Sequence, residues 1–252
     1  MSHRIDLNCD MGESFGPWAM GRDEEVMEAV TSVNVACGFH AGDPDVMART
    51  VRLAAARGLS IGAHPGLPDL QGFGRRALAV TPAEAHALVL YQVGALAAFA
   101  RAEGVRLTHV KPHGALYNMA AGDPDLARAI ASAVRTFDPS LALMGLAGSH
   151  LVLEAEALGL CAAWEVFADR SYEADGTLTP RSLPGAMVED EEEAAARVLR
   201  MVTEGLVRSR QGGDVPLRAD TVCIHGDQAG AAAFARRIRA ALRDAGVDVR
   251  PL

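Results

Sequence analysis

The chain alternates short apolar runs with longer segments whose apolar residues recur at helical spacing. Strands are predicted at residues 5–9, 33–37, 59–63, 105–110, 141–146, 160–166 and 221–224, with a short last strand at 247–249. Helices are predicted at residues 23–32, 44–57, 81–103, from 123 onward, and at 148–158, 189–206 and 229–245. Capping signals support two of the helix starts, namely Asp43-Pro44 and the Thr81-Pro82-Ala83-Glu84 box.

The order of these elements predicts the fold class. Seven strand–helix pairs in strict alternation indicate parallel strand pairing with the helices outside. Either an open doubly wound sheet or a closed barrel satisfies that pattern. Polar residues follow nearly every strand, which favours the barrel, because an open sheet gathers its site at one switch point. We therefore expect an α/β protein with a seven-stranded parallel β/α barrel, in a single domain over residues 1–252.

Polar residues in and after the strands are the candidates for chemistry. They are Asp6, Asn8, Asp10, Asn34, His40, His64, Lys111, His113, Glu165, His225 and Asp227. A single histidine of this kind is usually a satisfied core or loop residue. Four histidines, each just past a strand and beside glycine or proline, are better explained by a shared site at one end of the barrel.

Two chemistries suit a cluster of aspartate and histidine. One is a divalent metal that activates water, for which Asp6, Asp10, His40 and His64 are the candidate ligands. The other is metal-free acid–base catalysis on a C–N bond. No HExxH, paired CxxC, GxxxxGK[ST] or GxGxxG motif occurs, so the motifs leave both open. Five basic residues lie at or near the same loops: Arg75, Arg76, Lys111, Arg170 and Arg181. Two interpretations stay open, since together they could bind a carboxylate or phosphate, and singly each could be a solvated side chain.

Composition narrows the partners and the location. Of the 252 residues, 22% are charged and the net charge is −8, which argues against nucleic acid or an anionic membrane surface as a partner. The first residues contain no signal-like apolar core, and no apolar run is expected to span a membrane, so a cytoplasmic protein is expected.

The four cysteines form no CxxC pair and are expected to be buried thiols. The acidic run 189–193 is expected in the first turn of a helix.

Six motifs, taken together and in this order, resemble the LamB/YcsF family over nearly the whole chain. They are DLNCDMGESFG, VNVACGFHAGDP, GAHPGLPDLQGFGRR, HVKPHGALYN, EVFADRSYEADGTLTPRS and HGD. The resemblance implies a seven-stranded β/α barrel of the glycoside hydrolase and deacetylase type. It also implies ATP-dependent opening of 5-oxoproline (pyroglutamate) to L-glutamate by a 5-oxoprolinase, with this chain as the A subunit beside partner subunits B and C.

On this resemblance, Asp10, His64 and His113 are the expected catalytic residues. Substrate or phosphate is expected to contact Asn8, Asn34, His40, Arg75, Lys111, Glu165 and His225. ATP is then a co-substrate, bound here in an unfamiliar way or with the partner subunits. Two alternatives stay open: a stand-alone metal-dependent amide hydrolase or deacetylase, and a non-enzymatic ligand-binding or scaffold component. The dense cluster of polar strand ends argues against the last of these.

Overall fold

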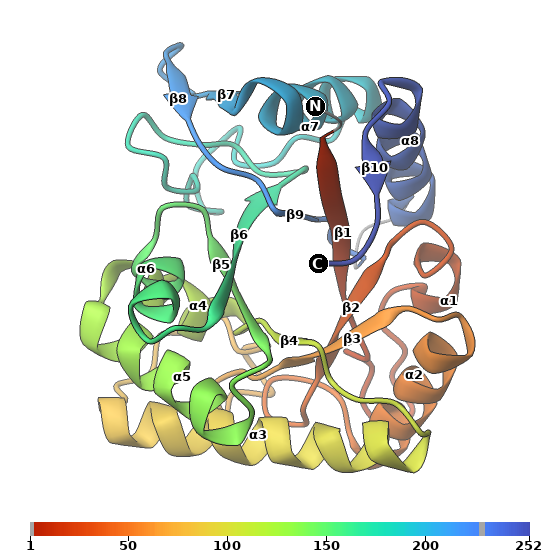
Figure 1. The fold of residues 1–252 in the computed structure, drawn as a ribbon, viewed down its shortest axis with the longest axis vertical. Helices are drawn as coiled ribbons and strands as arrows, with labels where there is room; N and C mark the ends of the chain where they lie inside the picture. The colour runs from red at the N-terminus through yellow and green to blue at the C-terminus, as the bar shows by residue number, and fades with distance from the viewer. Residues whose placement is uncertain (1–2, 227–229) are drawn as a thin grey trace.

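The computed structural model describes residues 3–226 and 230–252, and in these residues seven parallel strands close into a barrel (Figure 1). They are β1 (Arg4–Met11), β2 (Ser32–Ala36), β3 (Ser60–His64), β4 (His109–Val110), β5 (Ala142–Leu146), β6 (Cys161–Phe167) and β9 (Thr221–Cys223). Neighbours pair in chain order, and β9 pairs with both β6 and β1, which closes the ring. The predicted parallel barrel is confirmed. The predicted Asp227 lies outside the described residues.

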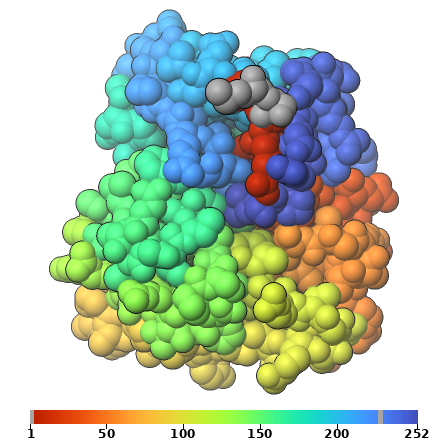
Figure 2. Space-filling view, viewed as in Figure 1, coloured from red at the N-terminus to blue at the C-terminus, as the bar shows by residue number. Residues whose placement is uncertain are grey.

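The C-terminal strand extends the sheet beside the first one. β10 (Asp248–Val249) pairs in parallel with the first two residues of β1, Arg4 and Ile5. Figure 2 shows this blue C-terminal segment against the red start of β1 on one face of the molecule. The expected last short strand is therefore present.

Helices surround the strands on the outside (Figure 1). They are α1 (Asp23–Val26), α2 (Pro44–Ala56), α3 (Pro82–Ala102), α4 (Gly114–Gly122), α5 (Pro124–Phe137), α6 (His150–Ala157), α7 (Glu191–Glu204) and α8 (Ala231–Asp244). Both capping predictions are confirmed: the Asp43 carboxylate accepts two backbone N–H groups at the start of α2, and Thr81 and Glu84 form the capping box of α3. The acidic run opens α7, as expected.

The helix predicted over residues 23–32 is much shorter than expected. Only Asp23–Val26 is helical, and β2 already begins at Ser32. Before it, the backbone N–H of Thr31 donates to the Leu7 carbonyl, while the Thr31 hydroxyl accepts the Leu7 N–H. These bonds join the chain to β1, so the backbone cannot remain helical there.

Three further elements differ from the sequence prediction. The strand expected at 105–110 pairs only over His109–Val110. α4 lies directly before α5 and was not predicted, and neither was the antiparallel hairpin of β7 (Leu206–Arg208) and β8 (Asp214–Pro216).

The expectation that no apolar run could span a membrane was wrong for α3, which is long and apolar enough by length and composition alone. In the structure α3 packs beside α5 and α2 and buries Val89, Val93 and Leu96.

The apolar core lies between the strands and the helices, and the inside of the barrel is polar. In β1 the buried apolar residues Ile5, Leu7 and Cys9 alternate with Asp6 and Asn8, as strand geometry requires. Three of the cysteines (Cys9, Cys37 and Cys223) are buried free thiols as expected. Cys161 is exposed, contrary to that expectation, because it is the first residue of β6, at the edge of the barrel wall next to the turn at residues 158–159.

Candidate functional site

The inward-facing polar residues of the barrel form layers joined by hydrogen bonds. In the first layer, one Asp6 carboxylate oxygen accepts the hydroxyls of Thr31 and Ser32 at 2.7 and 2.6 Å, and the other accepts the Thr221 hydroxyl at 2.5 Å. Burial raises the pKa of Asp6, although these bonds oppose the shift. Its oxygens are thus engaged in the barrel interior, and the structure does not bring Asp6 to the histidines with which it was expected to bind a metal.

The next layer links β1, β2 and β4 through amide and imidazole groups. Asn34 donates to Asn8 Oδ1 at 2.8 Å and accepts from His109 Nε2 at 2.8 Å. Gly62 is the register partner of both Asn34 and His109, and a Cβ atom at that position would lie 2.1 Å from the His109 ring. Burial lowers the pKa of His109 to about 3, so the ring is neutral at physiological pH. His109 thus fixes the orientation of the Asn34 amide.

A buried charge cluster forms the floor of the site. Lys111 Nζ lies 2.8 Å from Glu165 Oε1, 3.0 Å from Asp10 Oδ1 and 3.1 Å from Cys223 Sγ. Burial opposes its charge, but the neighbouring Asp10, Cys223 and Glu165 hold the pKa of Lys111 well above its ordinary value. Burial would likewise raise the pKa of Asp10, but the charges of His64 and Lys111 hold it well below its ordinary value. Lys111 is therefore cationic and Asp10 ionised near neutral pH.

The other oxygen of Glu165 accepts a hydrogen bond from a residue outside the strands. The Tyr117 hydroxyl, on α4, donates to Glu165 Oε2 at 2.8 Å. Burial and the Glu165 carboxylate raise the pKa of Tyr117 well above its ordinary value, so the phenol stays protonated. Because Asn8 also donates to Glu165 Oε1 at 3.0 Å, both carboxylate oxygens have partners.

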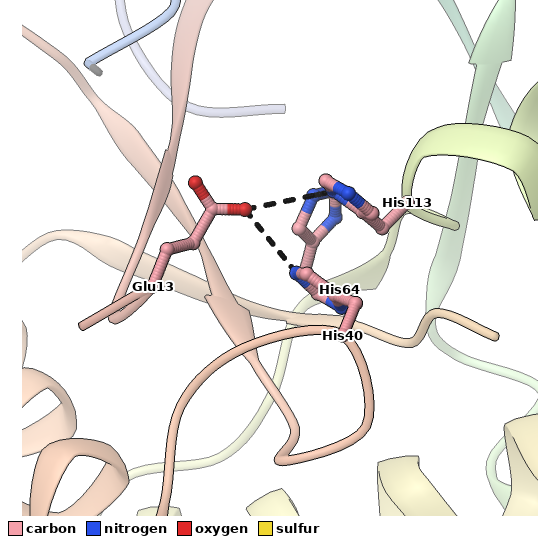
Figure 3. A group of neighbouring side chains, drawn as sticks. All are labelled: Glu13, His40, His64 and His113. Carbon is pink, nitrogen blue, oxygen red and sulfur yellow. Dashed lines mark hydrogen bonds and ion pairs between the residues drawn. The ribbon is translucent and has the colours of Figure 1, made fainter. Parts of the chain in front are cut away.

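Three histidines and one carboxylate gather above this floor (Figure 3). The rings of His40 and His113 stack, with centroids 3.7 Å apart, and His64 meets His113 edge to face. Glu13 Oε1 lies 3.2 Å from His40 Nε2 and 3.5 Å from His113 Nδ1. Burial lowers the pKa of His113 to about 3 and that of His40 well below its ordinary value. The expected ligands His40 and His64 thus meet, joined by His113 and Glu13 instead of Asp6.

A second histidine site lies across the pocket. His225 Nδ1 is 2.7 Å from Asp169 Oδ2, and its Nε2 is 3.1 Å from Arg181 Nη2. Burial would raise the pKa of Asp169, but its contact and hydrogen bond with His225 keep that pKa below its ordinary value. Since the Arg181 guanidinium can only donate, His225 Nε2 accepts and Nδ1 carries the proton toward Asp169. This is the arrangement of an oriented general base.

The charge cluster and both histidine groups reach one cavity of about 830 Å³. Among the expected residues, its lining includes Asp10, His64, Arg75, Lys111, His113, Arg181 and His225. Arg170 also borders the cavity and donates to the Thr179 carbonyl at 2.6 Å, whereas Arg76 pairs with Asp69 and is not in the lining. Trp164, expected in the core, packs against it and also borders the cavity. The cavity can therefore hold a small anionic substrate beside Lys111 and three arginines.

Four site residues were missed by the sequence prediction, namely Glu13, His109, Tyr117 and Asp169. Glu13 and Asp169 follow β1 and β6 by two residues each, so the rule that polar residues cluster after strand ends could have found them. His109 lies inside an apolar strand and Tyr117 on an unpredicted helix, so that rule could not find them, although both lie in the HVKPHGALYN motif.

Comparison with known proteins agrees with the geometry. Residues 5–252 match the LamB/YcsF family model. A Bacillus subtilis chain, named as the A subunit of 5-oxoprolinase, is 61% identical over 98% of this chain and 96% of its own length. A Methylococcus capsulatus chain of the same name is 61% identical over 100% and 97%. The expected function class, the A chain of a 5-oxoprolinase, agrees with the names of these relatives.

Solved structures extend the comparison to the fold. A lactam utilization protein from Thermus thermophilus superimposes with a TM-score of 0.94 at 53% identity, covering 99% of this chain and 100% of that one. The T48 deacetylase with substrate gives a TM-score of 0.51 at 14% identity, over 98% of this chain and 87% of that one, which shows a shared fold alone. With its family model matched from the first barrel strand to the C-terminus, this chain belongs to the LamB/YcsF family.

Proposed function

We propose that this chain is the A subunit of an ATP-dependent 5-oxoprolinase that opens 5-oxo-L-proline to L-glutamate in the barrel pocket. The observation that carries the proposal is the 61% identity, over nearly full length, to chains that bear the name of this 5-oxoprolinase component. The pocket supports it, because a cationic Lys111 and three arginines line a cavity large enough for a small carboxylate-bearing lactam.

The chemistry explains the need for ATP. A five-membered lactam is a stable amide, so we propose that its carbonyl oxygen first attacks the γ-phosphorus of ATP and releases ADP. Water then adds to the activated carbon, and the C–N bond breaks to give an acyl phosphate with a free amine. A second water releases phosphate and leaves L-glutamate. Two waters and one ATP are consumed for each ring opened.

The charge cluster at the floor suits the developing negative charge. Lys111 stays cationic next to two buried carboxylates, so it can stabilise an oxyanion or a phosphoryl oxygen without a change of protonation state. Arg75 and Arg181 border the cavity and suit the substrate carboxylate or the phosphate, since guanidinium groups bind such anions in bidentate fashion. These proposed roles agree with the expectation from the sequence that Lys111 and Arg75 hold anionic groups.

The activation of water has two candidate sites. Asp10 was expected to be the base, but its lowered pKa makes it a weak proton acceptor near neutral pH. The Nε2 lone pair of His225 faces Arg181 at the cavity, and Asp169 orients the ring from the other side. We therefore assign the proton transfer to His225, with Asp10 acting through its charge beside Lys111.

ATP and the partner subunits belong to the same proposal. The relatives' names designate one lettered component, which implies an enzyme of several subunits. The sequence carries no GxxxxGK[ST] loop, so we propose that subunits B and C contribute to the ATP site, over the open mouth of the barrel. A cytoplasmic location, where ATP is available, stays a prediction.

Glutamate release from 5-oxoproline tests the proposal. The purified chain is assayed with and without ATP, alone and with subunits B and C, and the His225→Gln, His113→Ala and Asp10→Asn variants are assayed in the complete mixture. We expect glutamate only with ATP and all three subunits, and roughly a hundredfold or greater loss in His225→Gln. Full activity in all three variants would overturn the assignment of the pocket as the reaction site.

One observation favours a second function, a stand-alone metal-dependent amide hydrolase. Three histidines and a carboxylate converge at the pocket wall, a donor set that suits a metal able to activate water. The same assay separates the two functions. Turnover of amide or acetylated substrates by the isolated chain, without ATP and sensitive to chelators, would replace the first proposal with the second.

A further inference from the structure

Four potential ligand atoms converge at the wall of the pocket (Figure 3). His113 Nδ1 lies 2.9 Å from His64 Nε2 and 3.5 Å from Glu13 Oε1, which in turn lies 3.2 Å from His40 Nε2. One atom from each of these four residues lies within 4.8 Å of the others. The four residues come from separate segments of the chain, after β1 and β2, at the end of β3, and before α4.

Backbone carbonyls fix the tautomers of two of these rings. His64 Nδ1 lies 2.7 Å from the Lys111 carbonyl, and His113 Nε2 lies 2.8 Å from the Phe73 carbonyl. A carbonyl oxygen can only accept, so each of these nitrogens carries a hydrogen. The remaining nitrogens, His64 Nε2 and His113 Nδ1, face each other at 2.9 Å, and His64 Nε2 also lies 3.3 Å from Asp10 Oδ2.

Two ring nitrogens this close need a proton or a metal ion between them. A single proton can link only two atoms, whereas four donor atoms converge here, one of them a carboxylate oxygen. In a tetrahedral site with metal–ligand bonds of about 2.0–2.1 Å, ligand atoms lie about 3.3–3.4 Å apart. The observed separations of 2.9, 3.2 and 3.5 Å are close to that spacing.

We propose that Glu13, His40, His64 and His113 bind one divalent transition-metal ion of the Zn²⁺ class. Imidazole nitrogen and carboxylate oxygen are the donors that such ions take, and carbonyl groups behind two of the rings supply the outer contacts that orient metal-binding histidines. The site follows from these contacts alone and does not depend on the proposed reaction.

Glycines hold the rings in place. Gly74 has φ +62°, and a Cβ atom there would lie 2.6 Å from His40 Cβ and 2.9 Å from His113 Cδ2. A Cβ atom on Gly66 would lie 2.6 Å from His40 Nδ1. The loop after β3 therefore packs its bare backbone against the rings. His40 Nδ1 itself is buried without a hydrogen-bond partner among the described residues, so packing, and no carbonyl contact, positions this ring.

A second group of potential ligands in the described residues fits an ion less well. Asp10, Cys223 and His225 also approach one another, but the Lys111 ammonium lies 3.0 Å from the Asp10 carboxylate and 3.1 Å from the Cys223 sulfur. A cation placed there would be repelled by Lys111. In the histidine-rich group, by contrast, the converging atoms are imidazole nitrogens and a carboxylate oxygen. Three of its four residues also border the cavity, which gives an ion a path of entry.

Metal binding by the full chain tests the inference without any substrate. The chain is freed of metal with a chelator and titrated with Co²⁺, and the visible absorption distinguishes four-coordinate from six-coordinate ions; bound Zn²⁺ is then counted by elemental analysis. We expect one ion per chain in a four-coordinate environment. Glu13→Gln and His113→Gln should each weaken Co²⁺ binding roughly 10–100-fold.

The matched control is His86→Gln, a histidine of α3 outside the group, which should bind Co²⁺ as the unchanged chain does. Far-UV circular dichroism confirms that each variant is folded, and Glu13→Gln serves if His113→Gln does not fold, since Glu13 lies in a loop. Absence of stoichiometric Co²⁺ binding overturns the inference. So does binding that survives in Glu13→Gln but is lost in His225→Gln, because the ion would then belong to the second group.

Discussion

The Lys111 ammonium lies 2.8 Å from the Glu165 carboxylate at the floor of the pocket, and solvent reaches only 3% and 0% of the two side chains. Asp10 completes the cluster at 3.0 Å from the same ammonium. A buried ion pair gains little over an apolar pair, but removal of one partner leaves an uncompensated charge. The cluster therefore makes the stability of the barrel depend on the same groups that are proposed to bind the substrate's negative charge.

Glu165→Gln should destabilise the chain by about 3–5 kcal/mol, because it removes one of the charges that balance Lys111. The free energy of unfolding is measured by urea denaturation. The double variant Lys111→Met/Glu165→Gln should lose less than the sum of the two single losses. The exposed pair Arg128–Glu154 is the control, and Arg128→Met should cost less than about 1 kcal/mol. Equal costs at the two pairs would contradict the interpretation.

Asp169→Asn should lower kcat in the complete complex by roughly a hundredfold, because the amide no longer orients His225 or stabilises its protonated ring. The acidic limb of the pH–rate profile should move to lower pH, an effect that a purely structural role would not produce. Asp138→Asn, in the turn that precedes β5, is the matched control and should leave the rate unchanged. An unaltered profile in Asp169→Asn would remove His225 from the proton transfer.

Stability should fall as the pH is lowered from about 6.5, with His109 as one cause. Burial depresses its pKa from the ordinary value of 6.5 to about 3 in the folded chain. Between these values the unfolded chain binds the proton and the folded chain does not, so the stabilisation is present above pH 6.5 and is lost as the pH falls toward 3. The contribution to the slope approaches about 1.4 kcal/mol per pH unit.

The His109→Gln variant measures this contribution through urea unfolding at pH 7, 6 and 5. Its slope of stability against pH should be shallower than that of the unchanged chain, because glutamine does not titrate. His86→Gln, a less buried histidine of α3, should leave the slope as it is. If both variants give the original slope, His109 does not contribute to the acid sensitivity.

Gly62→Ala should destabilise the chain by about 1–3 kcal/mol, because the added methyl group would lie 2.1 Å from the His109 ring and force it from Asn34. Gly94→Ala is the matched control within α3, where nothing in the described part of the chain lies within 4 Å of the added atom. That substitution should stabilise the chain by about 0.5–1 kcal/mol through helix propensity. Thermal unfolding gives the change in stability of each variant. If Gly62→Ala does not lower the stability, the His109 ring is not held in place by its contact with Gly62.

The local signals in the sequence determined the elements and the fold class. The caps at Asp43 and Thr81, the apolar strands and the strict alternation of strand and helix are properties of short segments, so they could be predicted without knowledge of the packing. The parallel barrel then followed, and with it the meeting of strand-end residues such as His64, Lys111 and Asp10. The start of β2 could not be predicted in this way, because the bonds of Thr31 to Leu7 that join the chain to β1 are long-range.

Only the tertiary structure decided which role each polar residue of the site takes. Asp6 and Asp10 have the same residue type and face the same side of β1, yet three hydroxyls surround the first while Lys111 and His64 hold the second ionised. Glu13 joins the histidines, and Asp169 orients His225, through contacts between loops far apart in the chain. The order of the sequence determines which residues follow a strand. The charge state, the burial and the hydrogen-bond partners of each of these residues depend on which other strands of the barrel lie beside it.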